Sequence, residues 1–218
     1  MTRVGAIVLA AGSGERFGDR KQFSELRTGF TLIDAALETM FRFTDSLVLV
    51  LPRGVEWDDP AVKAVAGGSS RIESAAHGLR ALTDDPDVVL IHDAAHPLAD
   101  IDTISALLVA IEGGADAAVP VLLVSDVVKR VDSGGAITTV GRENLGLAQV
   151  PMAFETSALR AAYRRFATLG GAWEDSLLVE KAGGRVVAVP GSPYNVHVVT
   201  QDDLRIARTL AHAKEGPE

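Results

Sequence analysis

A glycine-rich segment near the start of the chain combines small residues with closely spaced cations. It runs from Leu9 to Gly18, contains Arg16, and is followed by Arg20 and Lys21. Glycines let backbone N–H groups approach phosphate oxygens, and three cations within six residues add positive charge. Residues 1–27 hold five Lys or Arg against three Asp or Glu, a local balance of +2 in a chain of −8. The segment therefore predicts a polyphosphate site.

Two other phosphate motifs fit this segment poorly. The dinucleotide fingerprint G-x-G-x-x-G needs a spacing one residue shorter than that of Gly12, Gly14 and Gly18. This spacing disfavours an NAD-dependent oxidoreductase. The P-loop signature is missing because no G-K-[ST] follows the glycines. A plain glycine-rich turn stays open as the structural alternative.

A second segment, Ala66 to Ser74, places two glycines before a helix start. Ser70 and Glu73 have the spacing of a capping box, which predicts a helix running to about Leu82. The N-terminus of a helix attracts anions and polar groups, so the segment is a candidate binding site. An ordinary helix entry would leave the same pattern.

A third segment, Val88 to Pro97, is an apolar strand that delivers His92 and Asp93 at its carboxyl end. Ligands of open α/β sheets bind at that edge, and a carboxylate there suits Mg²⁺ held together with substrate phosphates. A hydrolase-type metal site around His-Asp-x-x-His is disfavoured because its further ligands usually lie on helices. For His92 alone, a structural hydrogen-bonding role is the simpler interpretation.

The rest of the pattern alternates apolar runs with helix-period segments, which predicts an α/β fold: a mostly parallel sheet flanked by helices on both faces, with right-handed crossovers. The predicted strands are Val4 to Ala10, Ser46 to Leu51, Val88 to His92, Ala117 to Val121 and Arg185 to Val189. The predicted helices are Thr31 to Phe43, Ser70 to Leu82, Ile101 to Glu112, Thr156 to Leu169 and Gln201 to Ala213.

Residues 125–149 break this alternation. Polar and apolar residues alternate around Asp132 to Gly135, which predicts an antiparallel hairpin or arm. An arm that projects from a sheet often serves a partner subunit, and a local flap over the site is the alternative. We expect the chain to form a single domain over residues 1–218 that carries this arm.

Composition excludes several classes of function. The net charge of −8 argues against nucleic acid polymers and anionic membranes as partners. The absence of cysteine removes thiolate nucleophiles and cysteine-type metal centres, and a fold free of disulfides suits the cytoplasm. No run approaches the roughly 20 apolar residues of a membrane-spanning helix.

Taken together and in order, these segments resemble the 2-C-methyl-D-erythritol 4-phosphate cytidylyltransferase family. The resemblance runs from about Val4 to Asp203. The matching residues are Ala10 to Arg16, Lys21 and Gln22, Gly67 and Gly68 with Arg71 and Ser74, His92 to Ala95, Asp126 with Lys129, Thr139 to Arg142, Leu177 to Glu180, and Asn195 to Val198.

The resemblance implies a Rossmann-like sheet, a homodimer built through the arm, and transfer of CMP from CTP to an alcohol phosphate with Mg²⁺ and release of pyrophosphate. By position, the nucleotide would be bound by Ala10, Ala11, Gly12, Ser13, Gly14, Gly68, Ser69, Arg71, Ser74 and Ala94. Asp93 would ligate Mg²⁺, and the implied catalytic residues are Arg16, Lys21, Arg142 and His197. The implied acceptor pocket comprises His96, Asp126, Val127, Lys129, Val150 and Trp173.

The departures from the family pattern gather in that acceptor pocket. The family usually has Arg at His96, Lys at His197, and Thr at Val127, Val150 and Trp173. A hydrogen bond lost to a substrate group costs about 1–3 kcal/mol when its partner is left unpaired. We expect methylerythritol phosphate as the acceptor because most members of such a family share a substrate. The departures leave two alternatives: another polyol phosphate such as ribitol 5-phosphate, or a weakly active regulatory protein that binds CTP.

Overall fold

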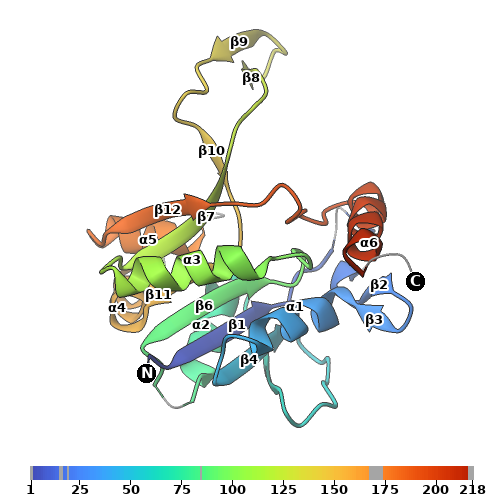
Figure 1. Ribbon diagram of the computed structural model, residues 1–218, viewed down its shortest axis with the longest axis vertical. Coiled ribbons are helices and arrows are strands. Elements are labelled where there is room, and N and C mark those ends of the chain that lie inside the picture. The colour runs from blue at the N-terminus through green and yellow to red at the C-terminus, as the bar shows by residue number, and fades with distance from the viewer. Residues whose placement is uncertain (1, 15–16, 19, 84, 167–173, 216–218) are drawn as a thin grey trace.

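The computed structural model of the protein describes residues 2–14, 17–18, 20–83, 85–166 and 174–215. Its centre is an eight-stranded sheet in the order β10-β7-β11-β6-β1-β4-β5, with β12 paired to β7. Figure 1 shows this sheet with the arm rising from one end of it. The strands are β1 (Val4–Leu9), β4 (Ser46–Leu51), β5 (Lys63–Ala66), β6 (Val88–Asp93), β7 (Ala117–Leu123), β10 (Gly146–Ala148), β11 (Met152–Glu155) and β12 (Val186–Pro190).

The inner strands are parallel and buried on both faces. β1 pairs in parallel with β4 and β6, and every residue of β1 is buried. A strand covered on both faces has a continuous apolar sequence, which is why these strands could be predicted well. The mostly parallel sheet is confirmed, with β11 inserted antiparallel between β6 and β7.

Helices pack on both faces of the sheet, as the sequence predicts. One buried cluster joins the sheet to α1 and α3, and another joins it to α2, α4 and α5. α6 packs with the β2–β3 hairpin in a third, smaller cluster. The helices are α1 (Leu32–Phe41), α2 (Arg71–Ala81), α3 (Ile101–Glu112), α4 (Thr156–Phe166), α5 (Asp175–Lys181) and α6 (Gln201–Glu215).

Short elements were harder to predict. The sequence indicated neither β5 nor β11, and the strands β2 (Glu25–Arg27) and β3 (Phe30–Thr31) and the 3-10 turn η1 (Lys21–Phe23) were also missed. Elements of two to four residues carry too few positions for a periodicity to emerge. α5 has only seven residues, about two turns, which is also too short for a helical period to emerge.

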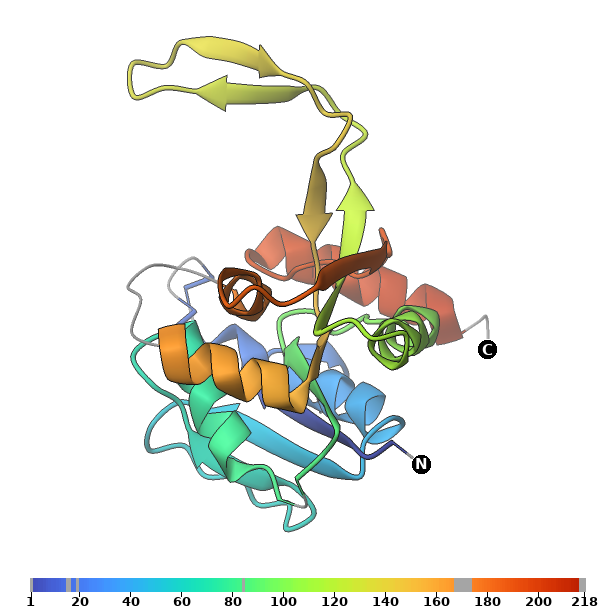
Figure 2. The ribbon, with the colours of Figure 1, turned by 90° about the vertical axis from the view of Figure 1, so that its left-hand side faces the viewer.

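The arm predicted for residues 125–149 is present. β8 (Val128–Val131) and β9 (Ile137–Val140) form a two-stranded antiparallel ribbon around Gly135, whose φ is +82°. The ends of β7 and β10 carry this ribbon away from the sheet (Figures 1 and 2). Within residues 2–14, 17–18, 20–83, 85–166 and 174–215, no helix is long and apolar enough to cross a membrane.

Candidate functional site

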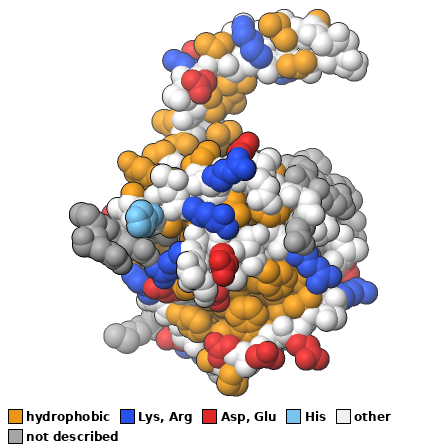
Figure 3. Space-filling model, turned by 90° about the vertical axis from the view of Figure 1, so that its right-hand side faces the viewer, with side chains coloured by type: hydrophobic (Ala, Val, Ile, Leu, Met, Phe, Trp, Pro, Cys, Tyr) orange, Lys and Arg blue, Asp and Glu red, His pale blue; other side chains and the backbone are white. Residues whose placement is uncertain are grey.

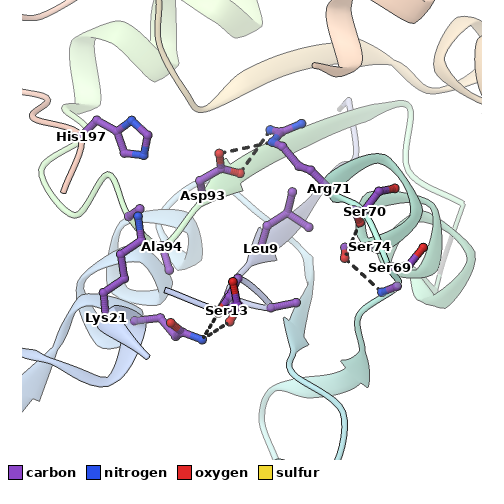
Figure 4. A pocket seen from close by; sticks show the side chains of 16 residues that line it. Leu9, Ser13, Lys21, Ser69, Ser70, Arg71, Ser74, Asp93, Ala94 and His197 are labelled. Carbon is purple, nitrogen blue, oxygen red and sulfur yellow. Dashed lines mark hydrogen bonds and ion pairs between the residues drawn. The ribbon is translucent and has the colours of Figure 1, made fainter. Parts of the chain in front are cut away.

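A cavity of about 530 Å³ opens at the carboxyl ends of β1 and β6. This is the sheet edge at which the sequence predicted a ligand. Sixteen residues line the cavity, from the glycine-rich loop, the start of α2, the end of β6 and the segment before α6. Figure 4 shows Lys21 and His197 on the side of this cavity opposite the start of α2.

The glycine-rich loop is held open by a buried glutamine. The Gln22 side-chain amide donates to the carbonyl oxygens of Ala10 at 2.8 Å and Gly12 at 3.1 Å. Gln22 is only 3% exposed, so its two bonds fix the loop from behind. A methyl group added at Gly12 would meet no atom within 4 Å, so the loop faces open space there. Backbone groups of this loop are therefore available to a ligand.

The start of α2 forms the second wall. Ser70 caps the helix by accepting a hydrogen bond from the Glu73 N–H at 3.1 Å. The Glu73 carboxylate turns instead to Ser69, accepting its hydroxyl and N–H at 2.6 Å, so only half of the predicted capping box forms. These bonds from Ser69 lower the pKa of Glu73. Gly68 completes the turn by donating its N–H to the Ser74 hydroxyl at 3.1 Å.

Asp93 lies across the cavity from this turn, in a bidentate ion pair with Arg71. The guanidinium Nε and Nη2 lie 3.3 and 3.2 Å from the two carboxylate oxygens (Figure 4). Burial alone would raise the pKa of Asp93, but the charge and hydrogen bonds of Arg71 outweigh it and hold the pKa below its ordinary value. Asp93 is therefore a carboxylate at neutral pH, although it is largely enclosed.

The third wall carries Lys21 and His197, whereas His96, which the sequence placed in the acceptor pocket, is buried and does not line the cavity. Lys21 donates through Nζ to the carbonyl oxygen of Val198 at 2.6 Å, which ties η1 to the segment before α6. His197 lines the cavity, and its ring stacks on that of His96 with centroids 4.5 Å apart and planes 18° apart. Burial first, and then the neighbouring His197, lower the pKa of His96 to about 4. His96 is thus neutral at pH 7.

The structure does not bear out the hydrogen-bonding role expected of His92, because neither of its ring nitrogens has a hydrogen-bond partner among the described residues. His92 is fully buried inside the sheet, and burial together with His96 lowers its pKa to about 3. Its imidazole is therefore neutral at physiological pH and does not line the cavity. His92 fills the core beside Asp93 at the end of β6.

The structure brings together most of the predicted nucleotide residues. The loop from Ala10 to Ser13, the Gly68–Ser69 turn, Arg71, Ser74 and Ala94 all line the cavity, as do Asp93, Lys21 and His197. Gly14 lies just beyond the lining with φ at +72°, a conformation that favours glycine, and accepts a bond from Phe17. Arg16 and Trp173 fall outside the described residues.

The remaining predicted residues lie elsewhere. Val150 is buried and precedes a cis proline, and its carbonyl accepts the Asn195 side-chain amide at 2.7 Å. The others belong to the arm and do not line the cavity of their own chain. These are Asp126, Val127, Lys129 and Arg142, of which Lys129 bonds Thr139 and Arg142 bonds the Ser125 carbonyl.

Sequence reasoning missed two residues next to the cavity, Tyr163 on α4 and Asp175 on α5. Asp175 has no exposed surface, contacts the Arg71 guanidinium and accepts the hydroxyl of Tyr163. A fully buried carboxylate has to be paired, but nothing in the local sequence says with what. The only signal is the pair Glu174-Asp175 at the start of an apolar helix.

The chemistry of the donor set suits a magnesium ion shared with a ligand. Mg²⁺ is typically held by one or two carboxylates together with substrate phosphates. Asp93 supplies one carboxylate at the cavity wall, and no group of three or more potential metal ligands occurs in the described part of the chain. The residues present therefore fit an ion that arrives with a phosphate ligand, and do not build an all-protein cage.

Comparisons with known proteins agree on one family. The family model for 2-C-methyl-D-erythritol 4-phosphate cytidylyltransferase matches residues 4–212. A protein of that name from Rhodococcus jostii is 37% identical over 94% of this chain and 93% of its own, and one from Roseobacter denitrificans is 34% identical over 98% and 99%. The crystal structure of the Thermus thermophilus protein of that name superposes with a TM-score of 0.83 at 31% identity, covering 96% of this chain and 99% of that one.

Proposed function

The chain belongs to the 2-C-methyl-D-erythritol 4-phosphate cytidylyltransferase family, and from this premise we propose that it transfers CMP from CTP to 2-C-methyl-D-erythritol 4-phosphate. The observation that carries the proposal is the cavity at the edge of the sheet. There a glycine loop, a helix start, Lys21 and the Arg71–Asp93 pair surround one space of about 530 Å³. Backbone donors and cations in that arrangement suit a triphosphate.

The reaction needs alignment and charge neutralisation rather than a covalent enzyme intermediate. A phosphate oxygen of the acceptor attacks the α-phosphorus of CTP, and the bond from that phosphorus to the oxygen bridging the β-phosphate breaks. Pyrophosphate leaves with the electron pair. Lys21 lines the cavity and is placed to neutralise the charge that develops on the leaving phosphates. We propose the same task for Arg16.

Asp93 would hold the magnesium ion that the family implies. When bound, such an ion neutralises phosphate charge and orients the phosphates. The chain's own part is to keep Asp93 ionised at the cavity wall, which the Arg71 pair does by lowering the pKa of Asp93. The start of α2 and the Gly68–Ser69 turn would hold the base and ribose of CTP, with polar groups of Ser69 and Ser74 at hand.

We propose that the acceptor side is completed by the arm of a second copy of the chain. Asp126, Val127, Lys129 and Arg142 do not line the cavity of their own chain, and the arm projects away from the body. Apolar side chains stand exposed along the arm and at its base (Figure 3). The exposed fractions are 74% for Leu123, 66% for Val127, 62% for Val131, 63% for Ile137 and 60% for Leu147.

Such an apolar surface suits burial against another copy. The pair Val131→Asp and Ile137→Asp tests this at neighbouring positions of the ribbon. Sedimentation velocity should show a dimer for the wild type and a monomer for the double variant. A matched control, Arg205→Asp together with Thr209→Asp on exposed positions of α6, should stay dimeric. A wild-type monomer at micromolar concentration would contradict the proposal.

The activity is tested by pyrophosphate release with CTP, Mg²⁺ and a panel of alcohol phosphates. Release with methylerythritol phosphate supports the proposed function. Release only with ribitol 5-phosphate, glycerol phosphate or another polyol phosphate would show a changed acceptor, as the histidines at 96 and 197 suggest. Binding of CTP without turnover on any acceptor would point to a regulatory protein.

A further inference from the structure

Behind the cavity wall, one guanidinium lies between two carboxylates. Arg71 faces Asp93 through Nε and Nη2 and contacts Asp175 through Nη1. Asp175 lies 104 residues further along the chain, at the start of α5, and its second oxygen accepts the Tyr163 hydroxyl. The three elements α2, α4 and α5 therefore meet at the residue that contacts Asp93.

The inner half of this network is enclosed, whereas the Arg71 and Asp93 side chains are 30% and 26% exposed. Asp175 has no exposed surface and Tyr163 is 7% exposed. Burial, and next the nearby Asp175, raise the pKa of Tyr163, so its hydroxyl stays protonated and keeps donating. Burial alone would lower the pKa of Arg71, but Asp175 and Asp93 together raise it, so Arg71 keeps its charge. Buried charges of this kind are strongly felt because little water screens them.

We propose that Asp175 is a positioning residue that keeps the Asp93 site negative enough for a divalent cation. The inference rests on the proposed function, because it takes Asp93 as the ligand of the magnesium ion. One guanidinium shared by two carboxylates leaves a net charge of −1 on the three groups. If Arg71 faced Asp93 alone, the pair would be neutral and would compete with the metal for the same oxygens. Asp175 contacts Nη1, the guanidinium nitrogen that Asp93 does not use, and supplies the missing negative charge.

The wild-type chain and three variants turn this charge count into a test. The three groups sum to −1 in the wild type, 0 in Asp175→Asn and −1 in the double variant. Arg71→Gln removes the only cation of the three groups, so their sum is no more positive than in the wild type. Mn²⁺ binding without nucleotide, followed by electron paramagnetic resonance, is the readout, with Asp93→Asn giving the background from other carboxylates. Even at the dielectric constant of water, a unit charge about 6 Å from a divalent ion changes its affinity by about tenfold, and weaker screening makes the change larger.

We expect the Mn²⁺ dissociation constant to rise at least tenfold in Asp175→Asn, to stay unchanged or fall in Arg71→Gln, and to return near the wild-type value in the double variant. Glu180→Gln, which removes an exposed carboxylate from the same helix, should stay within about twofold because water screens that charge. A merely structural role would weaken binding in Asp175→Asn and Arg71→Gln alike.

Weaker Mn²⁺ binding in Arg71→Gln, or wild-type binding in Asp175→Asn, would therefore overturn the inference. If Asp175→Asn does not fold, Arg71→Gln still decides it, because weaker Mn²⁺ binding in that variant contradicts the inference. The measurement needs neither acceptor nor turnover, so its failure is distinct from a failure of the proposed function. In the turnover assay, Asp175→Asn should raise the magnesium concentration required for half-maximal rate, and Asp175→Glu should restore part of the loss.

Discussion

The cavity at the sheet edge and the arm are built in opposite ways. The residues that form the cavity are fixed from behind by buried side chains such as Gln22 and Asp175. Nearly every residue from 125 to 147 in the arm is exposed, and its ribbon is held mainly by its own backbone pairing. The difference teaches that one chain organises the proposed nucleotide site by itself, whereas the arm residues would be placed by the second copy that we propose.

The largest expected effect is the loss of activity on removing the charge of Asp93, a change confined to the cavity. Asp93→Asn keeps the size of the side chain but removes the charge that would hold the ion. We expect pyrophosphate release to fall by roughly 100–1000-fold, as for loss of a group that stabilises transition-state charge. Circular dichroism should show an intact fold. Turnover within tenfold of the wild type would remove Asp93 from the site.

The second prediction tests whether the arm of one chain completes the cavity of its partner in the dimer. Asp93→Asn damages the cavity and Arg142→Ala damages the arm, so each homodimer should be nearly inactive. A heterodimer of the two, purified through different tags, would have one site with both parts intact. We expect about half of the wild-type activity per dimer, because one of its two sites works.

The control for this experiment is a heterodimer in which one chain is wild type and the other carries both substitutions. Its two sites each combine one intact part with one damaged part if the arms act in trans. It should then be nearly inactive. Activity in that control, together with none in the first heterodimer, would show that each arm serves its own chain.

A third comparison uses two glycines, one in each region. A methyl group at Gly78 would lie 2.4 Å from Ile7 Cγ2, where α2 packs on β1. Gly78→Ala should lower the free energy of unfolding by about 1–3 kcal/mol through overpacking, measured by urea titration. Gly135→Ala on the arm meets no atom within 4 Å, although its φ is +82°. It should strain the ribbon and leave unfolding of the body unchanged.

The smallest expected effect is the loss of folding stability at acid pH. In the folded chain the pKa of His96 is about 4, below the value near 6.5 of an exposed histidine. Between these two pH values the unfolded chain binds a proton that the folded chain does not. The contribution of His96 to the free energy of unfolding is therefore complete above pH 6.5 and is lost as the pH drops toward 4. From pH 7 to pH 5, the wild type should lose about 1–2 kcal/mol more than His96→Gln. Equal losses in both proteins would show that His96 does not titrate this way.

Much of the fold could be predicted from the sequence because long buried elements show a clear pattern of apolar residues. The five predicted strands are present to within one or two residues, and Ile101–Glu112 matches α3 at both ends. The glycine loop, the start of α2 and Asp93 followed, because the carboxyl ends of parallel strands meet at one edge. Short elements such as β11 and α5 escaped, since a few residues show no period.

The sequence by itself determined which residues carry charge, which strands are buried, and that an arm interrupts the sheet. Only the tertiary structure decided which distant groups meet: Lys21 with the Val198 carbonyl 177 residues away, His96 with His197, and Asp175 with Arg71. The physical reason is that periodicity records whether a position is buried, whereas the partner of a buried polar group depends on how whole elements pack. Asp175 shows the difference most clearly, because its neighbours in sequence say nothing of the Arg71 guanidinium that it contacts.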